Sequence, residues 1–132
     1  LALAAWSEPA KNPWATIAAT AIKDLLNLPA PPSDAPGVFR CSRPGLLTEL
    51  LEQADIKDVR QVEVTGKGVF ESPEHYWEFV TDVVAPIATP LRSNNEATRE
   101  KAKQAIMEAA KPYQQNGKII IPFACWVASG RK

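Results

Sequence analysis

The stretch LALAAWSEPAKNPW, residues 1–14, carries the strongest indication of the fold. Residues 1–6 form a short apolar run that a polar segment follows, which is typical of a buried strand. Asn12 followed by Pro13 predicts a helix start, because Pro suits the first helical position and Asn suits the cap before it. A chain that begins inside a buried strand is expected to be a fragment of a longer protein.

Apolar residues at helical spacing predict four helices further along the chain. The first covers about residues 12–28, the second begins near Ser42, and two more lie within about residues 72–115. Ser72 is the expected N-cap of the third helix, with Pro73 at its first position.

Prolines set the expected ends of several of these segments. Pro86 and Pro90 should kink or end the third helix, and the fourth should begin near Asn94. Residues 29–37 contain four prolines and predict a stiff linker, after which residues 38–40 are expected to form a short extended piece.

Two more strands are predicted. Residues 59–65 alternate between apolar and polar side chains, with Val62 and Val64 on one face and Gln61 and Glu63 on the other. Residues 66–68, Gly-Lys-Gly, are expected to break or bulge this strand. Residues 118–128 are rich in Ile, Phe, Trp and Val and predict a last strand, in which Pro122 marks a bulge or a local edge. The order of elements predicts an α/β protein with a three-stranded mixed sheet.

The composition favours one globular domain spanning residues 1–132. Hydrophobic residues make up 45% and charged residues 23% of the chain, and 15 Lys and Arg balance 15 Asp and Glu. A net charge of zero gives no electrostatic reason to expect nucleic acid or an anionic membrane as a partner. No apolar run approaches the roughly 20 residues that span a bilayer, so a cytoplasmic location is expected.

Few residues could carry catalysis. His75 is the single histidine and starts a predicted helix, where most histidines are surface residues. Cys41 follows an Arg and precedes a helix start, which could lower a thiol pKa, although a small half-buried residue is the simpler interpretation. Cys125 should be inert in an apolar strand. These three residues do not form a spaced metal-binding quartet, so no metal site and no catalytic residue are assigned.

Aromatic residues are the best candidates for a binding site. Trp6 ends the first predicted strand and Trp14 begins the helix after it, so both lie where α/β sheets bind ligands, beyond the carboxyl ends of strands. Trp77 falls off the apolar stripe of its helix beside Tyr76, and it could face a cleft. The alternative is that these residues pack in the core or at helix ends.

Four segments in register resemble class I S-adenosylmethionine-dependent methyltransferases, in particular the ubiquinone/menaquinone-biosynthesis methyltransferase-like group. The apolar strand of residues 1–6 with the Asn-Pro-Trp of residues 12–14 resembles their fifth strand and the segment after it. Residues 39–54 resemble the helix before their sixth strand, although Asp55-Ile56 stands where they often have Gly-Phe. The Ser-Pro-Glu-His-Tyr-Trp of residues 72–77 and the last strand with its Gly-Arg-Lys close at residues 119–132 complete the resemblance.

The resemblance implies a fold and an activity. The chain would be the C-terminal, substrate-side half of a Rossmann-like methyltransferase, with its last strand antiparallel and inserted between the other two. The helices at about 12–28 and 72–115 would cap the cleft of a small-molecule substrate, and Trp6, Trp14, Tyr76 and Trp77 would contact that substrate.

The family's S-adenosylmethionine site lies in a preceding half that these residues lack, so no cofactor-binding residue is carried over. The chain alone is therefore expected to be inactive and to bind no cofactor. We expect the first strand to pair through its edge with that missing half or with a second copy in a homodimer. The alternative function is a stand-alone, non-enzymatic truncated domain that acts in self-association or ligand binding.

Overall fold

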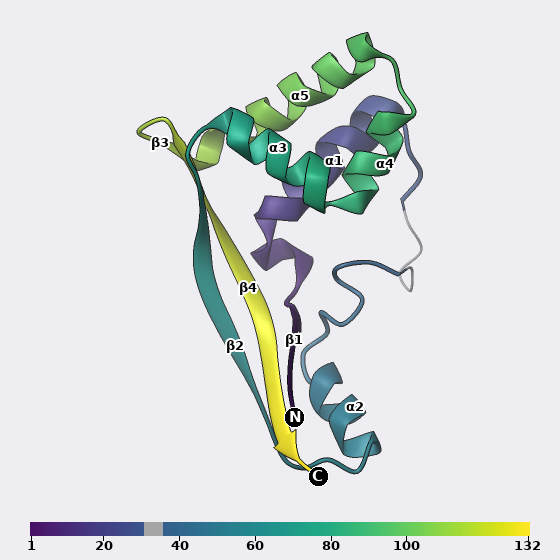
Figure 1. Cartoon of the computed structure of the whole chain (residues 1–132), viewed down its shortest axis with the longest axis vertical. Coiled ribbons are helices and arrows are strands. Elements are labelled where there is room, and N and C mark those ends of the chain that lie inside the picture. Colours follow the sequence, from purple (N-terminus) through teal and green to yellow (C-terminus); the bar gives the residue numbers. More distant parts are fainter. Residues whose placement is uncertain (31–35) are drawn as a thin grey trace. The chain divides into compact units, whose positions relative to one another are not determined.

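The computed structural model describes residues 1–30 and 36–132, and part of the predicted proline linker, residues 31–35, lies outside them. The described elements follow one another along the chain as Figure 1 labels them. They are β1 (Ala2–Trp6), η1 (Pro9–Lys11), α1 (Pro13–Leu26), α2 (Leu46–Gln53), β2 (Lys57–Phe70), α3 (Pro73–Val83), α4 (Ala85–Arg92), α5 (Glu96–Ala110), η2 (Lys111–Tyr113), β3 (Gln114–Gln115) and β4 (Lys118–Arg131).

The protein is α/β, but the prediction of a three-stranded mixed sheet is wrong. Over the described residues the sheet has four strands in the order β1-β4-β2, with β3 pairing to β4. β4 is antiparallel to β1 and β3, and Figure 1 shows β2 and β4 running in opposite directions. The fourth strand was missed because β3 has two residues and is formed by the Asn116-Gly117 turn, in which both residues have positive φ. The last strand does lie between the other two predicted strands, β1 and β2.

The described residues form two compact units, which we treat separately. The sheet unit contains residues 1–12, 36–66 and 122–132, and the helical unit contains residues 13–30 and 67–121.

In the sheet unit, α2 packs on one face of the sheet. Its Leu47 and Leu51 are buried together with Ile56 and with Ala128 of β4. The half-buried side chains that surround this cluster come from β1, β2, β4 and the loop before α2: Leu3, Ala5, Cys41, Val59 and Trp126. One helix and three strands thus share one small core.

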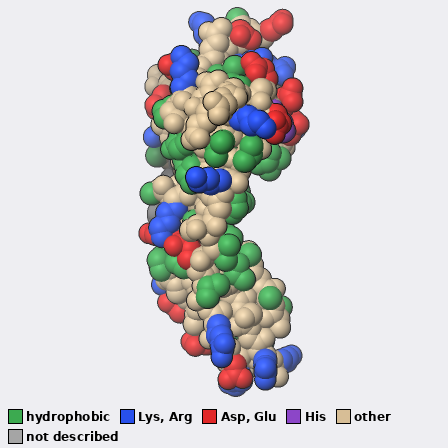
Figure 2. Space-filling model, turned by 90° about the vertical axis from the view of Figure 1, so that its left-hand side faces the viewer, with side chains coloured by type: hydrophobic (Ala, Val, Ile, Leu, Met, Phe, Trp, Pro, Cys, Tyr) green, Lys and Arg blue, Asp and Glu red, His purple; other side chains and the backbone are tan. Residues whose placement is uncertain are grey.

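No helix among the described residues of the sheet unit covers the opposite face of its sheet. The register pairs Ala4 with Val127 and Trp6 with Cys125, so these side chains point away from α2. Val62 and Val64 of β2 are 56% and 43% exposed on the same face. Figure 2 views the molecule from the side opposite α2, and it shows hydrophobic side chains over the lower part, where the sheet unit lies.

The segments around β2 differ from their predictions. The alternation of residues 59–65 is present, but the strand extends through Gly66-Lys67-Gly68 to Phe70 instead of breaking. A Cβ on Gly66 would lie 2.5 Å from the ring of Phe123, so this glycine permits close packing within the sheet.

The segments before α2 also differ. Residues 38–40 form a turn and not an extended piece. The helix begins at Leu46, after Pro44 and Gly45, and not near Ser42.

The helical unit packs α1, α3, α4 and α5 around a core of its own. Tyr76, Val80, Ile87 and Ile106 are fully buried there. The residues predicted to form the third helix and its proline-rich end form two helices: α3 ends at Val83, and α4 follows with Pro90 inside it.

The predicted start of α3 is confirmed. The Ser72 hydroxyl accepts a hydrogen bond from the His75 backbone N–H at 3.1 Å, and Pro73 is the first helical residue. The fourth predicted helix is α5, which begins at Glu96.

Candidate functional site

Trp6 borders a pocket in the sheet unit. The residue is half-buried at the end of β1, and its ring meets the Phe123 ring edge-on with 6.0 Å between centroids. The pocket has a volume of about 480 Å³, which is within the usual range for small-molecule sites. It is lined by β1, β4 and the loop before α2: Ala4, Ala5, Trp6, Gly37, Val38, Arg40, Cys41, Phe123 and Cys125.

The chemistry of this pocket is simple. Most of its lining is apolar or aromatic, and Arg40 is the one charged residue among the lining residues. The Arg40 side chain is exposed, so its guanidinium can meet an anionic group at the mouth of the pocket. The pocket therefore suits a small apolar molecule with a carboxylate or a similar anion.

A polar network lies just beyond the end of β1. The buried Ser7 hydroxyl donates a 2.6 Å hydrogen bond to Glu63 Oε1, and Lys11 Nζ lies 2.8 and 2.9 Å from the two Glu63 carboxylate oxygens. The hydrogen bonds from Lys11 and Ser7 lower the pKa of Glu63 from its ordinary value of 4.5. A carboxylate that is ionised and already accepts hydrogen bonds from two side chains is a poor general base. We therefore assign this network a role in stabilising the fold.

Asn12 completes the network from the next turn of the chain. The buried Asn12 amide donates to the Ala124 carbonyl at 2.9 Å, and its Oδ1 accepts from the Ala124 N–H at 3.1 Å. The same amide group also reaches the carbonyls of Ser7 and Glu8. Asn12 thus takes the place of a strand residue beside β4, where β1 has ended.

Trp14 and Tyr76 come together in the core of the helical unit. The Tyr76 hydroxyl donates a 2.7 Å hydrogen bond to the Trp14 carbonyl, and the Trp14 ring lies 6.0 Å from that of Phe79. Tyr76 has no exposed surface and Trp14 is 6% exposed. Burial, with a smaller contribution from Tyr113, raises the pKa of the Tyr76 phenol, which stays neutral and can donate. Both residues form core contacts here, and their role as substrate contacts stays a prediction.

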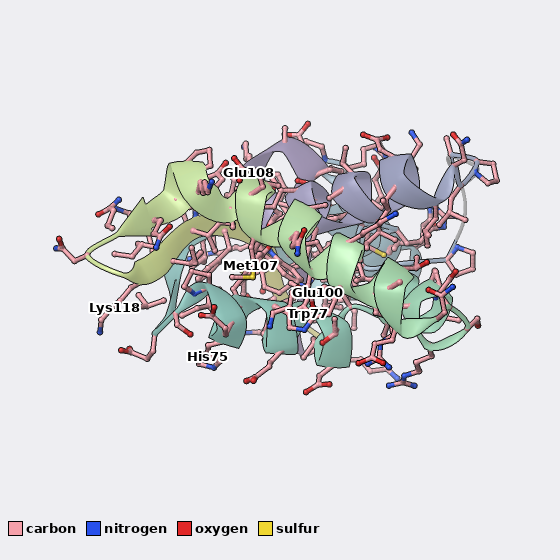
Figure 3. All side chains as sticks on the ribbon, turned by 90° about the horizontal axis from the view of Figure 1, so that it is seen from above. His75, Trp77, Glu100, Met107, Glu108 and Lys118 are labelled. Atoms are coloured by element: carbon pink, nitrogen blue, oxygen red, sulfur yellow. The ribbon has the colours of Figure 1, made fainter. Side chains whose placement is uncertain are left out.

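Trp77 is the more accessible aromatic residue of α3. Its side chain is half-buried, and Figure 3 shows it on the edge of α3 toward α5. His75 points away from the helices, and its Nδ1 accepts a hydrogen bond from the Glu71 backbone N–H at 3.3 Å. Trp77 could meet a ligand without rearrangement of the core, whereas His75 has a structural partner at the start of its helix.

The four predicted substrate residues divide between the two units. Trp6 belongs to the sheet unit, and Trp14, Tyr76 and Trp77 belong to the helical unit. Sequence reasoning missed Arg40, which reaches the pocket because residues 38–40 turn. It also assigned Glu63 to a polar strand face without foreseeing Ser7 and Lys11 as its partners, because nothing in the local sequence indicates a contact over more than 50 residues.

The described residues also allow a search for metal ligands, free thiols and membrane-spanning helices. No group of three His, Cys, Asp or Glu residues within the described part of the chain is arranged to hold a metal ion. Cys41 and Cys125 are free and half-buried, and both line the pocket. Among residues 1–30 and 36–132, every helix is too short or too polar to cross a bilayer.

Comparisons with known proteins assign no family. No protein-family model matches the chain, and no curated protein matches it significantly.

Proposed function

We propose that this chain is the substrate-side half of an S-adenosylmethionine-dependent methyltransferase that acts on a small molecule in the cytoplasm. The observation that carries the proposal is the strand order β1-β4-β2, in which the last strand is inserted between the two earlier ones. This is the order implied by the resemblance of residues 1–14, 72–77 and 119–132 to that family. The Rossmann-like identity of the sheet is part of the proposal.

The residues of this chain do not fit S-adenosylmethionine itself. No described strand of residues 1–30 and 36–132 leads through a glycine-rich turn into a helix, which is the usual site for the cofactor's charged end. Glu63 lies beside the segment that follows β1, and Ser7 and Lys11 already occupy its carboxylate oxygens. The cofactor is therefore assigned to a half that these residues do not include, and residues 1–132 alone are expected to be inactive.

The contribution of this chain is to hold and orient the methyl acceptor. Trp6 and Trp77 offer half-buried aromatic surface for stacking, one in each unit, and Trp14 and Tyr76 support α1 and α3 from within. Catalysis by orientation needs no general base on this chain, and none is assigned.

The first test is the intact mass of the protein purified from its natural source. The proposal expects a mass well above the 14.4 kDa of residues 1–132, together with methyl transfer from S-adenosylmethionine to a small molecule. A natural protein of 14.4 kDa would overturn the proposal.

Trp77→Ala tests the acceptor site in the active natural protein. The substitution should raise KM for the acceptor several-fold and leave S-adenosylmethionine binding unchanged. His75→Ala is the matched control, since it changes an outward-pointing residue of the same helix. Equal KM values for both variants and the natural protein would remove Trp77 from the site.

The second candidate function is a non-enzymatic domain that self-associates or binds a ligand, and the edge of β1 favours it. Leu1 and Gly130 exchange backbone hydrogen bonds, and Ser7 N–H bonds to Ala124. Odd-numbered residues of this segment therefore face β4, and the backbone groups of Ala2 and Ala4 point outward. An apolar edge of this kind pairs readily with another strand. If this function holds, the natural protein will have the 14.4 kDa mass and form a dimer, and Ala4→Pro will dissociate that dimer.

A further inference from the structure

The face of the sheet unit opposite α2, here called the open face, is apolar across three strands. Its members alternate with the residues that α2 covers. They are Trp6, Val62, Val64, Phe123, Cys125 and Val127, of which Trp6, Phe123 and Cys125 also line the pocket bordered by the loop before α2.

Strand β2 presents its apolar side to this open face and its polar side to α2. Gln61 Oε1 accepts hydrogen bonds from the backbone N–H and the hydroxyl of Thr48 on α2, at 3.2 and 3.0 Å. Glu63 is held by Ser7 and Lys11 on the same side. The polar residues of β2 thus have partners in the covered layer, and the valines are left exposed. This arrangement leaves the two valines of β2 exposed to water, and a second layer packed on the open face would bury them.

Positive charge marks one end of the open face. Arg60 and Arg131 line a hollow of about 610 Å³, together with one acidic residue, Asp58. Alternation along β2 and β4 directs both arginines to the side of Val62 and Val127. Neither arginine forms an ion pair within the described residues. Figure 2 shows Lys and Arg side chains, with some Asp or Glu side chains among them, at this lower end below the hydrophobic area.

We propose that the open face docks an amphipathic α-helix from a polypeptide segment outside residues 1–132. The apolar stripe of that helix packs on the open face, and acidic side chains at one of its ends pair with Arg60 and Arg131. A helix is the fitting occupant because α2 already covers the other face in this way, through Leu47 and Leu51 four residues apart. The inference does not depend on methyl transfer, since binding is measured without cofactor or acceptor.

The test uses fluorescent peptides and the chain of residues 1–132. One peptide of about 18 residues, five helical turns, carries Leu at positions i, i+3, i+4 and i+7 and three Glu at one end. A second peptide has Lys in place of Glu, and a third has the composition of the first without the stripe. We expect saturable binding of the first peptide and at least about tenfold weaker binding of the other two.

Matched variants locate the binding face. Val62→Thr with Val64→Thr keeps β-branched residues and should weaken binding of the acidic peptide at least about tenfold. Leu50→Gln removes an exposed apolar side chain on α2, 46% exposed, and should leave binding unchanged. Arg60→Gln with Arg131→Gln should weaken binding and reduce its salt dependence, and this pair decides the question if the threonine variant fails to fold.

The alkylation rate of Cys125 gives an independent test of where the peptide binds. In a Cys41→Ser background, bound peptide should slow alkylation of Cys125 on the open face several-fold. Equal binding of all three peptides, or unchanged alkylation of Cys125 at saturation, would overturn the proposal. So would a dimer of the wild-type chain that the Val62→Thr, Val64→Thr variant dissolves, because the occupant would then be a second copy.

Discussion

Asn12 shows how one side chain can continue the hydrogen bonding beside a strand after the neighbouring strand has ended. It donates to the Ala124 carbonyl and accepts from the Ala124 N–H, so β4 keeps its hydrogen bonds after β1 has turned away. Asn12→Ala would remove the partner of the Ala124 N–H in a buried place, while the Ala124 carbonyl would keep its hydrogen bond from the Ser7 N–H. We expect the free energy of unfolding to fall by about 2–3 kcal/mol, measured by urea denaturation.

Asn94→Ala provides the control for Asn12→Ala. The Asn94 amide donates to the Pro90 carbonyl at an exposed helix end, so its loss should cost less than about 1 kcal/mol. If the two variants lowered the free energy of unfolding by similar amounts, water would be replacing the Asn12 side chain beside Ala124.

Glu63 should make stability depend on pH. Its pKa in the folded protein lies below the ordinary value of 4.5, chiefly because Lys11 hydrogen-bonds to the carboxylate. A lowered pKa contributes stability above 4.5 that is lost as the pH falls through the folded-state pKa. The difference in unfolding free energy between wild type and Glu63→Gln should therefore shrink between about pH 7 and about pH 3 in urea titrations. Because Lys11 is exposed, the effect should be small.

Lys11→Gln tests the assigned cause. If Lys11 is responsible, Glu63→Gln in the Lys11→Gln background should change stability by nearly the same amount at every pH, apart from the smaller contribution of Ser7. An undiminished pH dependence in that background would assign the pKa shift to Ser7 instead.

At the scale of elements, local signals predicted where helices begin. Pro13 and Ser72-Pro73 mark the starts of α1 and α3, because caps and first-turn prolines depend on a few adjacent residues. The covered side of β2 could not be predicted in this way. Its alternation is visible in the sequence, but the choice of face depends on Thr48 and Ser7, which are distant along the chain.

The candidate site was predictable in part for the same reason. Trp6 was expected at the end of the first strand, and it does line a pocket there. Tyr76 and Trp77 are neighbours in the sequence, yet one is buried and the other half-buried. The sequence placed Tyr76 on the apolar stripe of the helix and Trp77 beside it, which agrees with this difference, but it does not indicate which elements cover each residue.

Gly130 offers a prediction about strand packing. A Cβ at this position would lie 2.4 Å from Ile56 Cγ2 and 2.9 Å from the Lys57 carbonyl oxygen, and the backbone atom cannot move cheaply. Gly130→Ala should lower the free energy of unfolding by about 1–3 kcal/mol in denaturant titrations. Gly37→Ala is the control, because a Cβ there has no neighbour within 4 Å and should be neutral or slightly stabilising. Equal effects would show that β2 and β4 separate easily at this end.

At the scale of the whole molecule, two cores share two long strands. β2 passes from the sheet unit into the helical unit after Gly66, and β4 makes the reverse passage at Pro122. Leu47 and Leu51 belong to the first core, and Ile87 and Ile106 belong to the second. The apolar contacts that bury each pair of core residues lie within that pair's own unit. We therefore expect the two units to differ in the free energy of local unfolding.

Hydrogen exchange on two core variants tests this division. Ile106→Ala removes a fully buried side chain and should cost about 2–5 kcal/mol. Amide protection should fall in α1, α3 and α5 and be retained in α2 and β1. Leu51→Ala should produce the reverse pattern, because Leu51 lies against Ala128 and Ile56 in the sheet unit. Equal loss of protection in both units for either variant would contradict this prediction. It would mean that β2 and β4 couple the two cores, so that the two units unfold in one cooperative transition.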